Sequence, residues 1–295
     1  MTIHEISNGN WVANINSVGA SLVGLRDGDF HLVEPHTRSG LYAGSVLAPW
    51  PNRLSNGKYS YRGRNFTVPI NESSRNNAIH GLVAEVSWLV SRRTQSSITF
   101  EYKLNSPKVY PGILNLFAHY KLSNYTCEIK IEAKNIGKYP APYGVSIHTY
   151  FVIGKPQKNN QIFLTLPCSK YVKVDKKRLL PIRICSVMDT QYNFLLSRRI
   201  ANLSIDHAFK YSTGYPKSVI LKDHTGAGIA LHFDRETQWI QVHTADRCLG
   251  PDSRMAIAIE PMTCPPDAFN SGLNLIDLAP KQRHTLKLKI QRYQD

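Results

Sequence analysis

The chain has 295 residues, of which 42% are hydrophobic and 19% are charged. This composition is typical of a folded globular protein and argues against an intrinsically disordered one. Its uninterrupted apolar stretches fall far short of the roughly 20 residues that a membrane-spanning helix needs. The first residues also lack the basic region and apolar region of a secretory signal. We therefore expect a cytoplasmic protein without a membrane partner.

The formal net charge of +15 raises the question of a nucleic-acid partner. The basic residues are dispersed, and their densest groups fall at 170–183, 198–199 and 281–292. In the last group, lysines alternate with Leu286, Leu288 and Ile290, which is the pattern of a half-buried strand with a solvated face. No zinc-finger spacing or RNP-type motif accompanies the charge. We expect no specific nucleic-acid partner.

The five cysteines are scattered and form no CxxC pair, which argues against a disulfide framework and a structural zinc site. Cys264 stands beside Pro265 and Pro266 without an activating base nearby in the sequence. We expect it to be a packing residue.

Strand-like alternation runs through nearly the whole chain. A hairpin is predicted at 59–61 and 66–68, around the turn 62–65. The further predicted strands are 97–104, 115–122, 125–133, 161–166, 218–221, 229–233, 239–243 and 285–290. One short helix is predicted at 189–199. No linker interrupts the series, so we expect residues 1–295 to form a single all-β domain, a large antiparallel β-sandwich.

In the segment IAIEPMTCPPDAFNSG (257–272), Glu260 stands at the end of the apolar run 255–259, just before Pro261, Pro265 and Pro266. A carboxylate at the end of a buried strand costs free energy unless it is paired with another group or has a functional role. Prolines would fix the loop behind it. The segment predicts either a proton acceptor at a pocket or a carboxylate that caps the strand or pairs with an arginine.

Four other polar residues have unusually specific surroundings. Arg53 lies in LAPWPNRLSNG, His80 in NAIHGLV beside Gly81, His148 in YGVSIHTYF and Asp206 in SIDHAF. Each also has an ordinary structural explanation: a surface ion pair for the arginine, core packing for the histidines and a turn cap for the aspartate. The sequence has no metal-ligand spacing such as HxH or HExxH, no nucleotide-binding glycine loop and no GxSxG motif. We therefore expect no metal and no cofactor.

Together, PWPNR, NAIHGL, IHTYF, IDHAF and IEPMTCPPDAFNSG resemble, in order and approximate spacing, the aldose 1-epimerase (galactose mutarotase) family. The resemblance runs from about Val18 to the C-terminal strand and implies the galactose mutarotase-like supersandwich fold. It also implies a monosaccharide ligand, no cofactor, and a monomer or weak dimer. By the same resemblance, Glu260 is the catalytic base, His148 the general acid, His80 a further active-site histidine, and Arg53 and Asp206 bind the substrate.

The resemblance implies interconversion of the α and β anomers of a free aldose such as galactose or glucose. Ionised Glu260, with a reference pKa of about 4.3, would accept the C1 hydroxyl proton, and protonated His148, from about 6.5, would donate to the ring oxygen. Two alternatives remain: a non-catalytic carbohydrate-binding sandwich, and a phosphosugar mutarotase, which the positive charge would suit. Gly81 and Leu82 follow His80 where the best-known galactose enzymes carry two glycines. The motifs therefore do not specify which sugar is the substrate.

Overall fold

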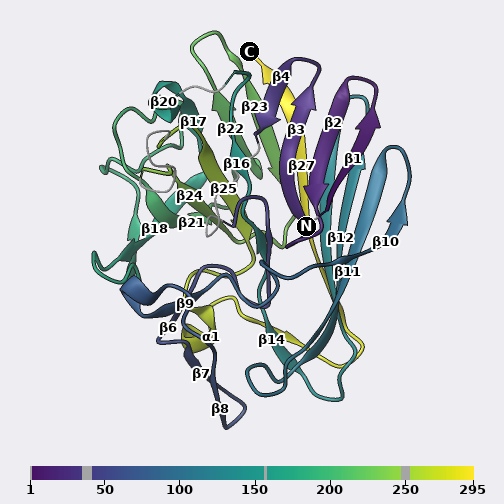
Figure 1. Ribbon diagram of the computed structural model, residues 1–295. Helices are drawn as coiled ribbons and strands as arrows, with labels where there is room; N and C mark the ends of the chain where they lie inside the picture. Colours follow the sequence, from purple (N-terminus) through teal and green to yellow (C-terminus); the bar gives the residue numbers. More distant parts are fainter. Residues whose placement is uncertain (1, 35–41, 156–157, 247–252) are drawn as a thin grey trace.

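The computed structural model describes residues 2–34, 42–155, 158–246 and 253–295, and nearly all of its regular structure is antiparallel sheet (Figure 1). A four-stranded sheet has the order β1 (Ile3–Asn8), β2 (Trp11–Asn16), β3 (Ser21–Asp27), β4 (Phe30–Val33). A nine-stranded sheet has the order β10 (Leu89–Arg93), β11 (Ser97–Asn105), β12 (Ile113–Leu122), β13 (Thr126–Asn135), β27 (Arg283–Gln294), β23 (Ala227–Phe233), β22 (Ser218–Lys222), β17 (Phe163–Thr165), β20 (Arg198–Arg199). A six-stranded sheet has the order β16 (Tyr150–Phe151), β25 (Ile257–Met262), β24 (Trp239–His243), β21 (Asp206–Tyr211), β18 (Cys168–Val174), β19 (Pro181–Ser186).

Short strand pairs and helical turns complete the described structure. The pairs are β5 (Val46–Leu47) with β15 (Ser146–Ile147), β6 (Arg53–Ser55) with β9 (Asn77–Ile79), β7 (Lys58–Tyr61) with β8 (Arg64–Thr67), and β14 (Ala141–Tyr143) with β26 (Ile276–Leu278). The helical turns are α1 (Ala268–Ser271) and the 3₁₀ turns η1 (Ser73–Arg75) and η2 (Asn159–Gln161). No helix in the described ranges is long and apolar enough to cross a membrane.

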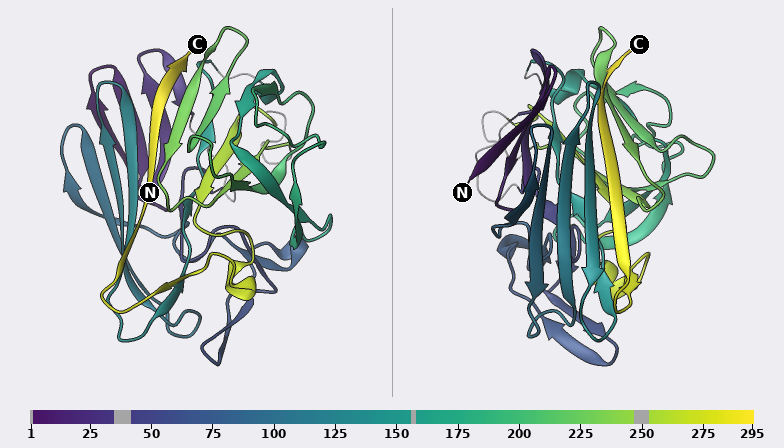
Figure 2. Two further views of the ribbon diagram at one scale, coloured as in Figure 1. Left: turned by 180° about the vertical axis from the view of Figure 1, so that it is seen from behind. Right: turned by 90° about the vertical axis from the view of Figure 1, so that its right-hand side faces the viewer.

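The nine-stranded sheet is apolar on one face and polar on the other, as the alternating sequence predicts. Leu286, Leu288 and Ile290 of β27 are buried, whereas Lys287 and Lys289 between them are exposed. The four-stranded and six-stranded sheets pack on the apolar face and form the second layer of the sandwich (Figures 1 and 2). Backbone hydrogen bonds also join the second layer's two sheets, because the amide of Val152 donates to the Leu32 carbonyl.

The six-stranded sheet has a core side and a pocket side because side chains alternate along a strand. In β25, Ile257 and Ile259 belong to the main hydrophobic cluster, and Glu260 therefore points the other way. Glu260 lies within β25, not at its end, so the predicted strand boundary was wrong. Pro261 also belongs to the strand, at a position where the pairing of β25 with β16 has already ended at Ala258.

The predicted helix at 189–199 is wrong. This stretch consists of turns followed by β20. The Thr190 hydroxyl donates to the Val187 carbonyl at 2.7 Å, and the Asn193 side-chain oxygen accepts from the Leu195 amide at 3.2 Å. Such side-chain bonds to nearby backbone compete with helical hydrogen bonds and favour turns. In the described residues the only α-helix is α1, which begins two residues after Pro266.

Candidate active site

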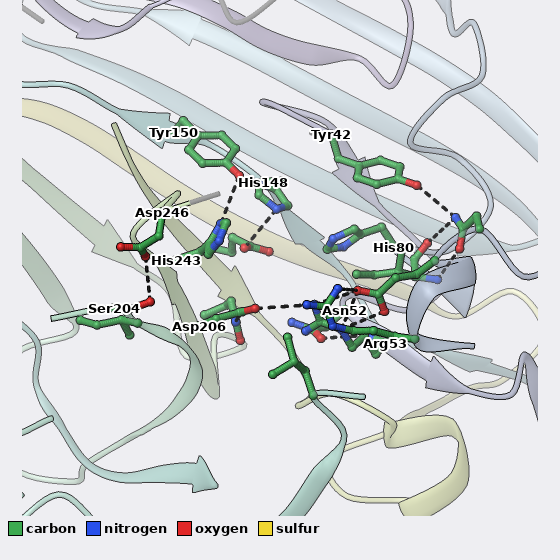
Figure 3. Close-up of a pocket in the computed structure, with 18 of the residues that line it drawn as sticks. Tyr42, Asn52, Arg53, His80, His148, Tyr150, Ser204, Asp206, His243 and Asp246 are labelled. Carbon is green, nitrogen blue, oxygen red and sulfur yellow. Dashed lines mark hydrogen bonds and ion pairs between the residues drawn. The ribbon is translucent and has the colours of Figure 1, made fainter. Parts of the chain in front are cut away.

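The five residues singled out from the sequence line one cavity of about 480 Å³, within the range of about 300–1,000 Å³ that ligand sites occupy (Figure 3). Glu260 comes from β25, Asp206 from β21 and Arg53 from β6. His80 directly follows β9, and His148 lies between β15 and β16. Residues more than 200 positions apart thus face each other because the six-stranded sheet, β6 and β9 surround the same space.

Glu260 and His148 form a close pair of titratable groups in the cavity. Glu260 Oε1 lies 3.3 Å from His148 Nε2, and their side chains are only 2% and 7% exposed. Burial raises the pKa of the Glu260 carboxyl well above its ordinary value, and the Asp206 charge adds to this rise. Burial likewise lowers the pKa of the His148 imidazole to about 3, with a further contribution from His243.

These shifts correct the protonation states expected from reference pKa values. Both shifts favour the uncharged forms of the two groups. Protonated Glu260 with neutral His148, and ionised Glu260 with protonated His148, differ only in the position of one proton. The geometry therefore brings together a proton donor and a proton acceptor that can exchange roles over a short distance.

His80 lies beside this pair. Its ring packs edge-on against the His148 ring with centroids 5.0 Å apart, and its Nδ1 is buried without a hydrogen-bond partner. The turn that presents it requires Gly81, because a side chain there would collide with the Ala48 carbonyl. His80 itself has a φ of 65°, a left-handed conformation that non-glycine residues seldom adopt. Burial also lowers the pKa of His80 well below its ordinary value.

Arg53 is held between two carboxylates. Its Nε lies 3.0 Å from Glu72 Oε2, and its Nη2 lies 3.6 Å from Asp206 Oδ2. Gln241 donates to the other Asp206 oxygen at 2.6 Å. Burial would raise the pKa of Asp206, but the surrounding basic groups, of which Arg53 contributes most, together leave this pKa below its ordinary value. The Arg53–Asp206 pair therefore presents fixed charges of both signs to a polar ligand.

Sequence reasoning missed several residues that line the cavity: Glu72, Gln241, His243 and Asp246. Tyr150 also lines it, and its hydroxyl lies 3.3 Å from His243 Nδ1. Gln241 and His243 could have been found, because they alternate on one face of the correctly predicted strand 239–243. Glu72 carries no such signal, since its role depends on Arg53, 19 residues earlier.

Among the residues that line the cavity, several buried polar atoms have no hydrogen-bond partner in the described residues: Glu260 Oε2, His80 Nδ1, His148 Nδ1 and Gln241 Oε1. Such atoms are costly to bury unless a ligand or water satisfies them. A polyhydroxylated ligand both donates and accepts hydrogen bonds, so it matches this set. Across the ranges that the structure describes, no three potential metal ligands gather in one place.

Comparison with known proteins gives one family model and several relatives. The model described as aldose 1-epimerase matches residues 2–291. The chain is 35% identical over 290 residues to the Escherichia coli (strain K12) protein YihR, itself described as uncharacterized; the match covers 97% of this chain and 92% of YihR. Among solved structures, a GalM/aldose epimerase homologue from C. elegans has a TM-score of 0.88 at 18% identity and 99% coverage of both chains. A galactose 1-epimerase from Lactobacillus acidophilus NCFM has a TM-score of 0.83 at 16% identity, covering 99% of this chain and 95% of that one. These likenesses confirm the sandwich fold that the motifs imply.

Proposed function

Because the chain belongs to the aldose 1-epimerase family, we propose that it interconverts the α and β anomers of an aldose such as galactose or glucose. The reaction opens the sugar ring at the bond between C1 and the ring oxygen and closes it on the opposite face. It needs one group that takes a proton from the C1 hydroxyl and one that gives a proton to the ring oxygen.

The observation that carries the proposal is the pairing of Glu260 with His148 at 3.3 Å in a cavity lined by polar side chains. One carboxyl and one imidazole share a single proton there. A module that only binds sugars has no need of such a pair. The L. acidophilus relative, whose name specifies galactose, supports a hexose as the substrate.

Sugar binding prepares the pair for reaction. A sugar hydroxyl that donates to the unpartnered Glu260 Oε2 stabilises the carboxylate form and lowers its pKa. The shared proton then moves to His148 Nε2. This leaves Glu260 as the base and His148 as the acid.

The chemical step moves two protons in balance. Glu260 takes the C1 hydroxyl proton while the bond from C1 to the ring oxygen breaks and the ring oxygen takes the proton of His148. The product is the open-chain aldehyde, with Glu260 protonated and His148 neutral. After rotation about the C1–C2 bond, ring closure reverses both transfers and restores the enzyme.

The other three residues keep the open sugar in place. Arg53 and Asp206 bind hydroxyls through charge-assisted hydrogen bonds, and His80 donates or accepts at the oxygen nearest the reacting bond. Holding the open chain near its ring-closing geometry favours closure over release.

The test is Glu260→Gln, which keeps the size of the side chain and removes the base. We expect anomerisation, followed by polarimetry or NMR from pure α-anomers, to fall by about 10²- to 10⁴-fold. Glu128→Gln is the matched control, because Glu128 is exposed on β13. Near-UV circular dichroism establishes that both variants are folded.

An unchanged rate in the Glu260→Gln protein would exclude this residue as the base. Sugar binding by the wild-type protein without any anomerisation would instead favour a non-catalytic carbohydrate-binding sandwich.

A further inference from the structure

A rim of positive charge borders the cavity on the side of the β18–β19 hairpin. Lys176 and Leu179, at the tip of this hairpin, line the cavity together with Arg75 at the end of η1. Lys176 is exposed, and Arg75 is partly buried. Two cations from separate segments of the chain thus meet at the entrance.

Hydrogen bonds order the backbone of the rim and join its two segments. Within the hairpin, Asp175 accepts hydrogen bonds from the amides of Lys177, Arg178 and Leu180 at 2.7–3.0 Å. Arg178 then joins the hairpin tip to the η1 segment, because its Nε donates to the Arg75 carbonyl at 3.0 Å and its Nη2 to the Asn76 carbonyl at 2.8 Å. The backbone that carries Lys176 is thereby joined to the backbone that carries Arg75.

The carboxylates deeper in the cavity are already paired. Glu72 contacts both Arg53 and Arg75, and Asp206 contacts Arg53. Asp246, which also lines the cavity, is paired with Arg254. Glu72 is thus shared between Arg53 and Arg75 and offsets only part of the positive charge of the rim.

The rim itself carries an excess of cations. The tip of the β18–β19 hairpin has three cationic residues, Lys176, Lys177 and Arg178, and one carboxylate, Asp175. No ion pair within the described ranges includes Lys176, and the hydrogen-bond acceptors of Arg178 are uncharged carbonyl and amide oxygens. Arg75 Nε is buried and has no hydrogen-bond partner in the described structure. The exposed charge of Lys176 is therefore available to an incoming anion.

We propose that this rim is a subsite for an anionic substituent, a phosphate, sulfate or carboxylate group, carried by the aldose on the part of the sugar remote from C1. The proposal rests on the proposed function, because C1 and the ring oxygen must face Glu260 and His148 for the substituent to lie near Arg75 and Lys176. It deepens that function by naming an anionic sugar as the preferred substrate class.

The first experiment measures equilibrium binding by calorimetry, which does not depend on turnover. Glucose, glucose 6-phosphate and glucuronate are titrated into the wild-type protein at low salt. We expect at least one anionic sugar to bind about tenfold or more tightly than glucose, as hydrogen bonds to charged groups allow. The comparison of phosphate with carboxylate identifies the group that fits. The difference in affinity between the anionic sugar and glucose must shrink as salt is added, because salt screens charges that are exposed to solvent.

Lys176→Gln should reduce the preference for the anionic sugar by about twofold to fivefold, the effect of an exposed charge pair. Lys170→Gln, which removes an exposed charge of β18 outside the cavity, is the matched control and should leave the preference unchanged. Equal affinity for charged and neutral sugars at low salt would overturn the subsite. If both lysine variants lost the same share of the preference for the anionic sugar, the subsite would also be overturned, because the loss would then reflect only the change in net charge.

Anomerisation of the same sugars is measured separately. If an anionic sugar binds through Lys176 but is not anomerised, the proposed function fails and the subsite stands. If glucose is anomerised without any preference for anionic sugars, the function stands and the subsite fails.

Discussion

Glu260 and His148 lie in surroundings that disfavour charge on either side chain. Burial raises the pKa of Glu260 and lowers that of His148 to about 3. Both shifts favour a pair that carries one proton, on Glu260, and they move the protonation of His148 to about pH 3. A free histidine would instead change its charge near pH 6.5.

This one-proton pair predicts the pH dependence of the anomerisation rate. On the acid side, we expect no loss of activity with a midpoint near 6.5, because the lowered pKa of His148 moves the second protonation to about pH 3. On the alkaline side, the rate should fall with the loss of one proton, since the doubly deprotonated pair has no acid. The measurement is NMR exchange between anomers across pH, with the uncatalysed rate subtracted. An acid midpoint at the usual histidine value, or no alkaline decline, would contradict the assignment.

At the scale of elements, the β18–β19 hairpin and the η1 segment form the entrance as one unit. Arg178 makes this connection with four acceptors: the carbonyls of Arg75 and Asn76 and the side-chain oxygens of Asn56 and Asn77. It has no contact with the space where C1 would lie, so it acts as a positioning residue. Its effect on a sugar passes through Arg75 and Lys176.

Arg178→Ala should therefore weaken substrate binding more than catalysis. We expect KM to rise by about tenfold with kcat changed little, and the free energy of unfolding to fall by about 1–3 kcal/mol from the lost hydrogen bonds. Arg183→Ala, on the exposed strand β19 of the same hairpin, is the control. Steady-state kinetics and urea unfolding test the prediction. A lowered kcat at unchanged KM would argue against a positioning role.

The elements also explain what the sequence predicts well and what it does not. Strands such as β11, β12, β13 and β27 were predicted within about two to four residues, because alternation records which face is buried. The stretch 189–199 failed because local side-chain bonds decide its turns.

In the candidate site, the motifs identified the residues that reach the cavity directly. Glu72, Asp246 and the pKa shifts of the Glu260–His148 pair could not be predicted, because they depend on side-chain contacts that only the folded chain brings together. Burial, which determines those pKa values, is a property of the folded arrangement and not of the local sequence.

At the scale of the whole molecule, the sheets depend on one another. The main hydrophobic cluster includes Trp11 of the four-stranded sheet, Leu116 of the nine-stranded sheet and Ile259 of the six-stranded sheet. β27 lies in the middle of the nine-stranded sheet and pairs with β13 on one side and β23 on the other. We propose on this basis that residues 1–295 form a single domain.

A single domain should unfold in one cooperative transition. The four tryptophans are all buried, and Trp11 and Trp239 lie in different sheets, so their fluorescence reports on separate parts of the sandwich. We expect the urea curves from tryptophan fluorescence and from far-UV circular dichroism to coincide. Separate midpoints for the two signals would mean that the layers unfold independently.

The central place of β27 also has a consequence for biosynthesis. β27 follows every other strand of its sheet along the chain, yet β13 and β23 both need it as a neighbour. While the ribosome is still making residues 283–294, each of these strands has an open edge, and open edges can pair with other nascent chains. The nine-stranded sheet is therefore complete only after this strand has emerged, and until then the edges of β13 and β23 that β27 will cover are exposed to pairing with other chains.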